Sequence, residues 1–243
     1  MTETGPAISI KGKAFEENEL LFDTLDIQIE AGHWTCLLGP SGVGKSTLLR
    51  LLAGLETHVT FEGTITASDA QEVASRVSYM AQSDLLLPWA TIGENICLGA
   101  KLRGETIHKN KRAAIIEQVG LGDHIDKYPS ELSGGQRQRA ALARTLMEDT
   151  PIVLLDEPFS ALDAKTKFQM QELVAETLRG KTLLLVTHDP GEAVRLCHRI
   201  YILNRHELHV ARHLQPPFPK DHKDEAVFAL QNELLAQIRG TEQ

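Results

Sequence analysis

The segment from Leu37 to Thr47 constrains this chain more than any other, because it interrupts an apolar run with a glycine-rich turn. Gly39 and Gly44 are five positions apart and are followed at once by Lys45 and Ser46, which fits the phosphate-loop pattern G-x-x-x-x-G-K-[ST]. Glycines let the backbone curve around an anion with successive N–H groups pointing inward. The lysine supplies a mobile positive charge for the β- and γ-phosphates of a nucleotide, and the serine hydroxyl can bind Mg²⁺.

The sequence on either side of this turn has the character that a phosphate loop requires. Residues 34–38 are typical of a strand, and residues 47–55 are typical of a helix that opens at Ser46 and adds its positive dipole end. The alternative is a glycine turn beside a solvated lysine, and the flanking strand and helix argue against it. We therefore predict that the chain binds a nucleoside triphosphate. The candidate binding residues are Gly39, Pro40, Ser41, Gly42, Val43, Gly44, Lys45, Ser46 and Thr47.

The bulk composition argues against several classes of function. A net charge of −8 disfavours a general nucleic-acid binder, which usually carries a basic excess. The first six residues lack the basic and apolar segments of a signal peptide, and no apolar run approaches the ~18 residues of a membrane span. The three cysteines are scattered without metal-type spacing, and Cys36 and Cys197 are expected to be buried thiols in a reducing compartment.

Strand and helix signals alternate along most of the chain. Residues 8–10 and 24–29 alternate apolar with polar positions, as the strands of an N-terminal antiparallel flap would. A turn at residues 62–63 leads into a short strand at 64–66. Further strands are expected at 76–80, 152–155, 182–186 and 199–203, and helices at 111–119, 137–147, 164–178, 191–197 and 223–239. This order predicts an α/β fold with a mainly parallel sheet.

The domain organisation follows from the same signals. Helices before residue 149 predict an α-helical subdomain inserted into the core over about residues 89–149. The core itself is expected to span residues 1–203. Residues 204–243 are expected to hold a proline-rich linker and a terminal helix, and the rest of this tail has no assignment.

Six motifs occur in a fixed order along the chain, and together they resemble the nucleotide-binding subunit of an ABC transporter. They are GPSGVGKST at 39–47, a glutamine loop at Gln82, LSGGQ at 132–136, LLDEP at 154–158, SALD at 160–163 and THD at 187–189. A phosphate loop alone is shared by many NTPases, whereas LSGGQ followed by an acidic strand end is much narrower. The resemblance covers nearly the whole chain and implies the P-loop NTPase fold of an ABC ATPase.

The resemblance implies a role for each residue at the strand ends. Asp156 ends an apolar strand and would hold Mg²⁺, through water, at the sheet edge where ligands of open α/β folds bind. Glu157 would orient and polarise the attacking water as a general base. His188 would contact the γ-phosphate, and Gln82 would reach both Mg²⁺ and the water. The alternatives are a solvated strand end for the acidic pair and a structural role for the histidine.

The LSGGQ segment implies a second anion site. Ser133, Gly134, Gly135 and Gln136 open a helix with glycine backbone and a positive dipole end, and in the family this motif completes the ATP site of the opposite subunit. Ser133 as a simple N-cap is the alternative, and the two roles are compatible. Asp163 would face the partner. The resemblance therefore implies an ATPase that forms a homodimer around two Mg-ATP.

Two departures from the family pattern concern the nucleotide. Phe15 stands where the family more often has tyrosine, and its ring could stack on adenine or belong to the core. Phe22 is the other candidate, and its place in an apolar run favours the core. Val43 replaces a frequent serine in the phosphate loop, where backbone groups do the binding.

The remaining features favour an importer. The chain has no fused membrane span, and the segment 83–96 resembles the importer groove that receives a permease coupling helix. Its apolar residues Leu85, Leu86, Leu87 and Trp89 would then dock the permease, with core packing as the alternative. The LLPW and THDPGEA segments look like the nitrate, sulfonate and taurine importers, a group that includes importers of thiamine-related pyrimidines, and the latter look closest.

These resemblances imply a set of partners and a location. An importer ATPase would bind integral membrane permease subunits at the cytoplasmic face of the inner membrane as a peripheral subunit. It would act indirectly with an extracytoplasmic solute-binding protein and not with nucleic acid. The alternatives are the ATPase of an exporting or lipid-handling ABC complex and a soluble ABC ATPase without a transport role.

Overall fold

The chain forms two compact units, each assembled from separate stretches of sequence. The computed structural model describes residues 4–17, 19–204, 207–221 and 223–240. Unit 1 comprises Met1–Tyr79, Thr150–Glu157 and Arg179–Gln243, and unit 2 comprises Met80–Asp149 and Pro158–Leu178. Among the described residues, no helix combines the length and the apolar character needed to cross a membrane.

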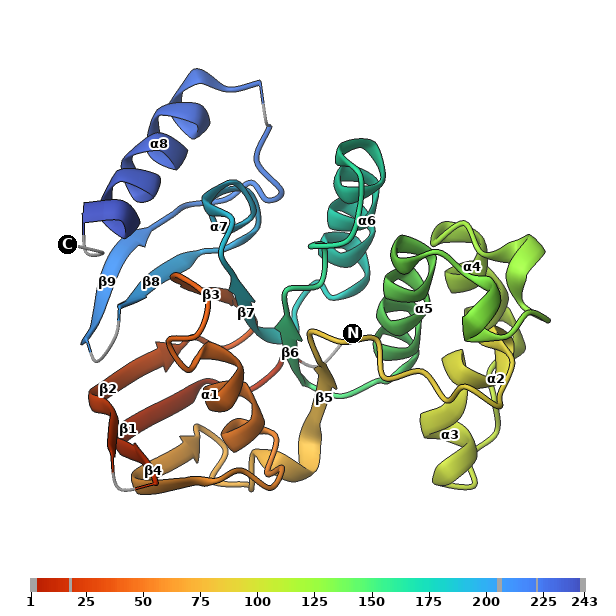
Figure 1. Ribbon diagram of the computed structural model, residues 1–243, viewed down its shortest axis with the longest axis horizontal. Coiled ribbons are helices and arrows are strands. Elements are labelled where there is room, and N and C mark those ends of the chain that lie inside the picture. The colour runs from red at the N-terminus through yellow and green to blue at the C-terminus, as the bar shows by residue number, and fades with distance from the viewer. Residues whose placement is uncertain (1–3, 18, 205–206, 222, 241–243) are drawn as a thin grey trace. The chain divides into compact units, whose positions relative to one another are not determined.

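A six-stranded sheet is the centre of unit 1 (Figure 1), in the order β5-β6-β7-β3-β8-β9. Its strands are β3 (Trp34–Leu38), β5 (Val77–Met80), β6 (Ile152–Asp156), β7 (Thr182–Thr187), β8 (Arg199–Asn204) and β9 (Glu207–His213). Strands β6, β7, β3 and β8 pair in parallel, which confirms the mainly parallel sheet. The strands β3, β6 and β7 are buried along their whole length, as expected for a sheet covered on both faces.

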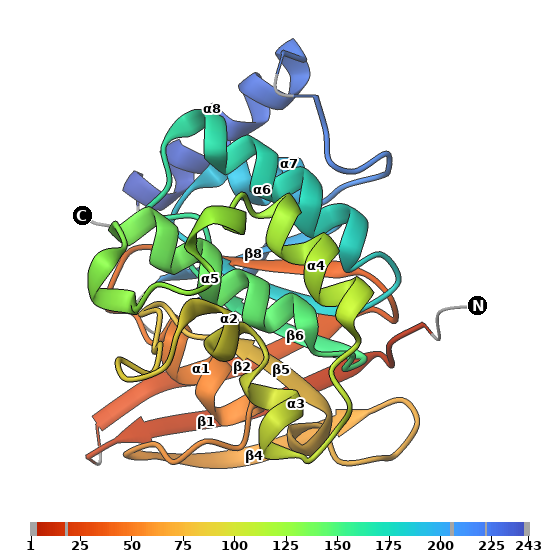
Figure 2. The ribbon, with the colours of Figure 1, turned by 90° about the vertical axis from the view of Figure 1, so that its right-hand side faces the viewer.

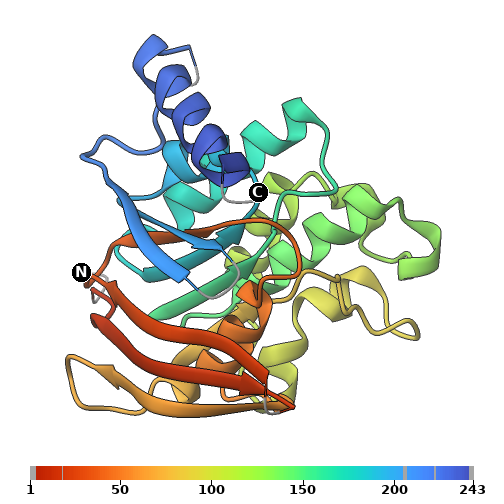
Figure 3. The same ribbon diagram turned by 60° about the vertical axis from the view of Figure 1, so that its left-hand side comes forward.

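The antiparallel β9 was not expected from the sequence. It pairs with β8 from Arg199↔His213 to Asn204↔Glu207 and forms an edge of the sheet. Part of the tail that had no assignment therefore belongs to the sheet of unit 1. The terminal helix α8 (Glu225–Gly240) follows and packs against α7 (Pro190–Leu196), as Figure 3 shows.

The N-terminal flap is a three-stranded antiparallel sheet in the order β2-β1-β4. Its strands are β1 (Ile8–Glu16), β2 (Glu19–Ile29) and β4 (Val59–Ala67). The predicted turn at residues 62–63 was wrong, because Glu62 and Gly63 lie inside β4 and pair with Lys13 and Gly12 of β1. Glycines on both strands allow this close approach, since a Cβ at Gly63 would collide with the backbone of β1.

One apolar core joins the flap and the central sheet of unit 1. It contains Phe22 and alternate residues of β1 and β2, together with the buried face of α1 (Lys45–Leu52) and residues of β3, β6, β7 and β8. Helix α1 begins at Lys45 and ends at Leu52, so the predicted helix was placed two residues late at its start and three at its end. The expected buried thiols are confirmed, and Cys97 is buried as well.

Unit 2 is mostly helical, with α5 (Gly134–Met147) at its centre. Helices α2 (Ile92–Ile96) and α4 (Lys109–Gln118) pack on α5 (Figure 2). The short α3 (Leu98–Leu102) follows α2. Helix α6 (Ala164–Thr177) comes from the second stretch of this unit. Buried alanine and leucine residues on one face of α5 explain its central place.

Candidate active site

The register of the parallel strands brings three candidate segments to one edge of the sheet in unit 1. Leu38 at the end of β3 pairs with Thr187 at the end of β7, and Asp156 at the end of β6 pairs with Val186. The glycine-rich loop, the acidic pair and His188 therefore leave the sheet at its carboxyl edge. Open α/β folds bind their ligands there.

The conformation of the loop requires its glycines. Gly42 and Gly44 have φ of 83° and 92°, a region that side chains strongly disfavour. A Cβ at Gly44 would also lie 2.6 Å from the buried Phe22 ring, and a Cβ at Gly39 would collide with the Leu203 carbonyl. The loop thus fits closely against the flap and β8.

The amino end of α1 presents its N–H groups without a local acceptor. Gly44 is the N-cap, and within the described chain no side chain caps this helix. The first turn also carries no acidic residue. The initial N–H groups of a helix have no intrahelical partner, and the dipole adds positive charge there. This end of α1 is suited to a phosphate group.

The Lys45 ammonium lies at the same loop. Its Nζ donates to the carbonyl oxygens of Gly39 and Pro40 at 2.8 and 2.5 Å. Burial lowers the pKa of Lys45, while the nearby carboxylates Glu157 and Asp156 oppose the shift. A bound phosphate could replace the two carbonyls as the partner of this cation.

Asp156 offers a buried carboxylate suited to a divalent cation. Its residue is 1% exposed, and burial raises its pKa, while hydrogen bonding to Ser46 counteracts that shift. Its Oδ1 has no hydrogen-bond partner among the described residues. A carboxylate oxygen without a partner beside a serine hydroxyl fits Mg²⁺, which takes few protein ligands when phosphates supply others.

Glu157 and His188 lie together at the end of their strands. His188 Nδ1 is 3.1 Å from Glu157 Oε1. Glu157 is 8% exposed and has φ of 47°, and its N–H donates to the Val186 carbonyl at 2.9 Å. A positive φ in a non-glycine residue costs free energy and persists where the surroundings hold it. The strained backbone turns the carboxylate toward His188.

Two residues near this edge were missed in the sequence analysis. Tyr79 of β5 interacts with Asp156, and burial together with that charge raises its pKa to about 12. Glu192 of α7 is 3% exposed and accepts a hydrogen bond from Thr187, which precedes His188. The available signal was an acidic residue next to the apolar residues Ala193 and Val194 in the helix that follows THD.

The LSGGQ segment in unit 2 forms a capped helix start. Ser133 is the N-cap of α5, and its hydroxyl accepts the Gln136 N–H at 3.3 Å while the Gln136 side chain accepts the Ser133 N–H at 2.8 Å. This confirms the capping role of Ser133. The Gln136 amide nitrogen is also 2.9 Å from a ring nitrogen of His124. The N–H groups of Gly134 and Gly135 lie between the two capped residues.

The other predicted residues of unit 2 lie on its surface. Gln82 is exposed in the segment after β5. Asp163 is exposed and caps α6 by accepting the Thr166 N–H and hydroxyl at 3.1 and 2.7 Å, and these hydrogen bonds lower its pKa. Both side chains are therefore accessible to a ligand or a partner.

The apolar patch after Gln82 divides into exposed and buried residues. Leu85 and Trp89 are 62% and 74% exposed, whereas Leu86 is 8% exposed. Docking through Leu86 was therefore a wrong expectation, because its side chain packs inside unit 2. Asn95 fixes the loop, since its Oδ1 accepts the Leu87 N–H at 2.7 Å. Leu85 and Trp89 remain the residues available to a partner.

The two aromatic candidates differ in burial. Phe22 is fully buried against the glycine loop, which confirms that it belongs to the core. Phe15 is half-buried in β1, opposite Leu20 and Thr60 of the neighbouring strands. Its ring therefore keeps an accessible part.

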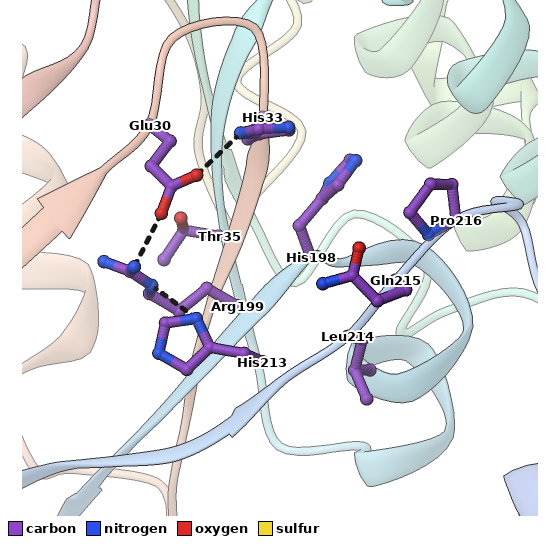
Figure 4. Close-up of a pocket in the computed structure, with 9 residues that line it drawn as sticks. All are labelled: Glu30, His33, Thr35, His198, Arg199, His213, Leu214, Gln215 and Pro216. Carbon is purple, nitrogen blue, oxygen red and sulfur yellow. Dashed lines mark hydrogen bonds and ion pairs between the residues drawn. The ribbon is translucent and has the colours of Figure 1, made fainter.

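A cavity of about 220 Å³ in unit 1 is separate from the glycine loop. Thr35, near the start of β3, lines it, whereas the loop follows the other end of that strand. Figure 4 shows Glu30 between His33 and Arg199, at 3.1 and 2.6 Å, with His213 beyond Arg199. The ring of His198 lies 4.4 Å from the rings of both His33 and Phe218.

Several known proteins are similar to this chain in sequence. The family model described as ABC transporter matches residues 22–160. An uncharacterised ABC transporter ATP-binding protein of Haemophilus influenzae is 43% identical, over 91% of this chain and 94% of the relative. An aliphatic sulfonates import ATP-binding protein of Streptomyces avermitilis is 40% identical, over 98% of this chain and 93% of the relative.

A solved structure is also similar. It is an ATP-binding cassette described as a dimer in a post-hydrolysis state bound to ADP and phosphate, with a TM-score of 0.73 and 28% identity. The match covers 85% of this chain and 100% of that one. These similarities confirm the expected fold and the resemblance to the nitrate, sulfonate and taurine importers. They favour an importer over the exporting and soluble alternatives.

Proposed function

The chain belongs to the ABC transporter family as an ATPase coupled to import, and we propose that the complex it drives takes up aliphatic sulfonates. The choice of sulfonates as the cargo rests on the relative of Streptomyces avermitilis. That protein is named for aliphatic sulfonate import and aligns over 98% of this chain. This name favours sulfonates over the thiamine-related pyrimidines that the sequence motifs also suggested.

In the proposed mechanism, unit 1 binds the triphosphate of ATP. The uncapped N–H groups at the start of α1 and the loop glycines surround the phosphates, and Lys45 exchanges the Gly39 and Pro40 carbonyls for phosphate oxygens. The exposed part of the half-buried Phe15 would stack on the adenine ring. Ser46 and Asp156 would hold Mg²⁺. The bound ion would neutralise charge on the β- and γ-phosphates.

Glu157 is the proposed catalytic base. Its carboxylate orients a water molecule for attack on the γ-phosphorus and accepts its proton as the bond to the ADP oxygen breaks. His188 contacts the γ-phosphate from its position 3.1 Å from Glu157. Their shared place at the carboxyl edge of the sheet supports these roles.

A second copy of the chain is proposed to complete each site. Ser133, Gly134 and Gly135 of one copy would contact the γ-phosphate held by the other, and the exposed Asp163 would face the partner. The dimeric state of the related cassette with ADP and phosphate supports this arrangement. ATP would favour the closed dimer, and loss of the γ-phosphate would reverse the shift.

The closing of the dimer is proposed to act on a membrane permease. Leu85 and Trp89 would receive a permease element on the cytoplasmic face of the inner membrane, and a solute-binding protein would deliver the cargo from the other side. Charged substitution of both residues should abolish co-purification with the permease. Leu102→Asp is a matched control, because Leu102 of α3 is 77% exposed in the same unit. Equal retention by all variants would contradict this surface.

The cargo can be tested with the complex isolated from membranes through a tag on this chain. After reconstitution in liposomes, its ATP hydrolysis is measured with the co-purified solute-binding protein and one solute at a time. We expect an alkanesulfonate to stimulate hydrolysis several-fold more than nitrate or a thiamine-related pyrimidine. Stimulation by the pyrimidine alone would overturn the sulfonate assignment and leave the import ATPase in place.

A further inference from the structure

His188 projects from the end of β7 with a side chain that is 55% exposed. Packing around the imidazole therefore does little to fix its direction. The neighbouring residue Thr187 is 2% exposed, and Glu192 of α7 is 3% exposed. These buried residues hold the backbone from which His188 extends.

A short series of hydrogen bonds links the residues on either side of His188. The Thr187 hydroxyl donates to Glu192 Oε2 at 2.6 Å, and the same hydroxyl accepts the Asp189 N–H at 3.1 Å. The Asp189 carboxylate then accepts the Gly191 N–H at 2.7 Å and caps α7. These hydrogen bonds connect residues 187, 189 and 191 to the start of α7, and His188 lies between the connected residues.

We propose that Glu192 is a positioning residue for ATP hydrolysis, acting through the Thr187 hydroxyl to hold His188 in line with Glu157. Because the hydroxyl donates its hydrogen bond to the carboxylate, a lone pair of the hydroxyl oxygen faces the Asp189 N–H. The direction of both hydrogen bonds is thereby set by one side chain, that of Glu192. This inference rests on the proposed roles of His188 and Glu157.

The burial of Glu192 argues for such a role. Removing a carboxylate from water costs free energy, and an apolar residue could fill the same helix position. The distance of 2.6 Å lies in the range of a hydroxyl bonded to an ionised carboxylate, which is stronger than a neutral hydrogen bond. A rigid, charge-assisted contact is suited to fixing a histidine whose error in position would slow the reaction.

The test measures kcat and KM for ATP with the purified full chain. Glu192→Gln and Thr187→Val should each lower kcat roughly 10- to 100-fold, the scale of a misplaced catalytic group, with KM within about twofold. Thr187→Ser keeps the hydroxyl and should retain activity near the wild-type value. Loss of activity in Thr187→Ser equal to that in Thr187→Val would contradict a role for the hydroxyl.

Thr182→Val is the matched control for lost stability. Thr182 begins the same strand, is fully buried, and its hydroxyl donates to the Pro6 carbonyl at 2.7 Å and accepts the Gly32 N–H at 2.9 Å. Thr182→Val should lower the melting temperature about as much as Thr187→Val while kcat stays near wild type. An equal loss of kcat in both variants would show a structural effect and overturn the proposal.

A double-mutant cycle with His188→Ala separates the positioning role of Glu192 from the proposed role of His188 in hydrolysis. If Glu192 acts through His188, Glu192→Gln should have no further effect on kcat in the His188→Ala background. A full additional loss there would overturn the positioning role alone. Near-normal turnover of His188→Ala itself would instead contradict the proposed function of the site.

Discussion

Two helices of this chain begin with glycine-rich sequences, and they differ in which groups use their first N–H groups. Helix α1 follows Gly44 and has neither a side-chain cap nor an acidic first turn in the described chain. Helix α5 follows Ser133, whose capping box with Gln136 satisfies two N–H groups locally. The capping box leaves the N–H groups of Gly134 and Gly135 without a partner within the helix, because N–H groups in the first turn of a helix have no intrahelical acceptor.

The difference shows how the work is divided between the two units. Beside α1, unit 1 places a buried lysine and two buried carboxylates. A helix end alone contributes about 0.3–1 kcal/mol to binding an anion at a surface, which is too little to hold ATP. We therefore expect unit 1 to bind nucleotide by itself, and α5 to act only on a nucleotide that another surface already holds.

The largest expected effect belongs to unit 1. Glu157→Gln should lower ATP hydrolysis by roughly 10²- to 10⁴-fold, because general-base catalysis is lost while the size and shape of the side chain persist. ATP binding should remain, and the chain should accumulate as an ATP-bound dimer. Nucleotide titration and size-exclusion chromatography with ATP measure both results. Near-normal turnover would remove Glu157 from the role of base.

A substitution in unit 2 should separate hydrolysis from binding. Ser133→Arg should lower hydrolysis by at least about 100-fold, because the bulky cation displaces the helix end from the γ-phosphate. The affinity of the monomer for ATP should change by no more than about threefold, as for a remote surface substitution. Ser130→Arg, on the exposed surface three residues earlier, is the control and should retain activity. A large loss of monomer affinity in Ser133→Arg would break the division between the units.

The glycines of the two helix starts should differ in their effect on stability. Gly44→Ala should cost about 2–4 kcal/mol, since it combines left-handed backbone strain with overlap with Phe22. Gly42→Ala meets open space and should cost about 1–2 kcal/mol from strain alone. Gly134→Ala has neither problem and should be within about 0.5 kcal/mol of wild type. Urea unfolding measures all three, and equal costs would contradict the description of the loop.

A smaller effect concerns the stability of unit 1 at acid pH, through His198 in its cavity. Burial and the neighbouring His33 lower the pKa of His198 to about 4, with Lys220 acting in the same direction, while the charge of Glu30 opposes the shift. The Trp34 N–H donates to Nδ1 of the neutral ring. The folded chain therefore binds its proton less readily than the unfolded chain, whose histidine has a pKa near 6.5. The stabilisation is complete above pH ~6.5 and is lost as the pH falls toward 4. At 1.36 kcal/mol per pKa unit this is about 3 kcal/mol, which solvent contact reduces to about 1–2 kcal/mol.

The two tryptophans allow this acid effect to be assigned to one unit. Trp34 lies in unit 1 and donates to His198, whereas Trp89 lies exposed in unit 2. In a Trp89→Phe variant, unfolding can be followed by the fluorescence of Trp34 between pH 7 and 4.5. The free energy of unfolding measured in this way should fall as the pH is lowered. His198→Gln, which does not titrate, should flatten the dependence. An unchanged pH dependence in that variant would assign the effect to other groups.

The motifs and the parallel sheet could be predicted because local sequence determines them. The loop glycines, the acidic pair and the LSGGQ helix start each carry their chemistry within a few residues. The antiparallel β9 could not be predicted from its own residues, because its partner β8 determines it. Likewise Leu86 and Trp89 have similar apolar character in one segment, and only the packing of unit 2 shows that the first is buried.

The site residues show the same limit. Asp156 was expected at a strand end, whereas its contact with Tyr79 of β5 depends on strand order in the sheet. Glu192 was missed because its role depends on burial beside Thr187 and not on a motif. Burial and long-range pairing are the properties that one sequence leaves undetermined.

The most direct test of the division between the units mixes two inactive chains. Glu157→Gln lacks the base in unit 1, and Ser133→Arg lacks the helix end in unit 2. If each nucleotide lies between unit 1 of one copy and unit 2 of the other, a mixed dimer has one intact site, and equal mixing should restore about one quarter of the wild-type ATP hydrolysis. If the mixture stays as inactive as its components, the two copies do not share their sites and the account is wrong.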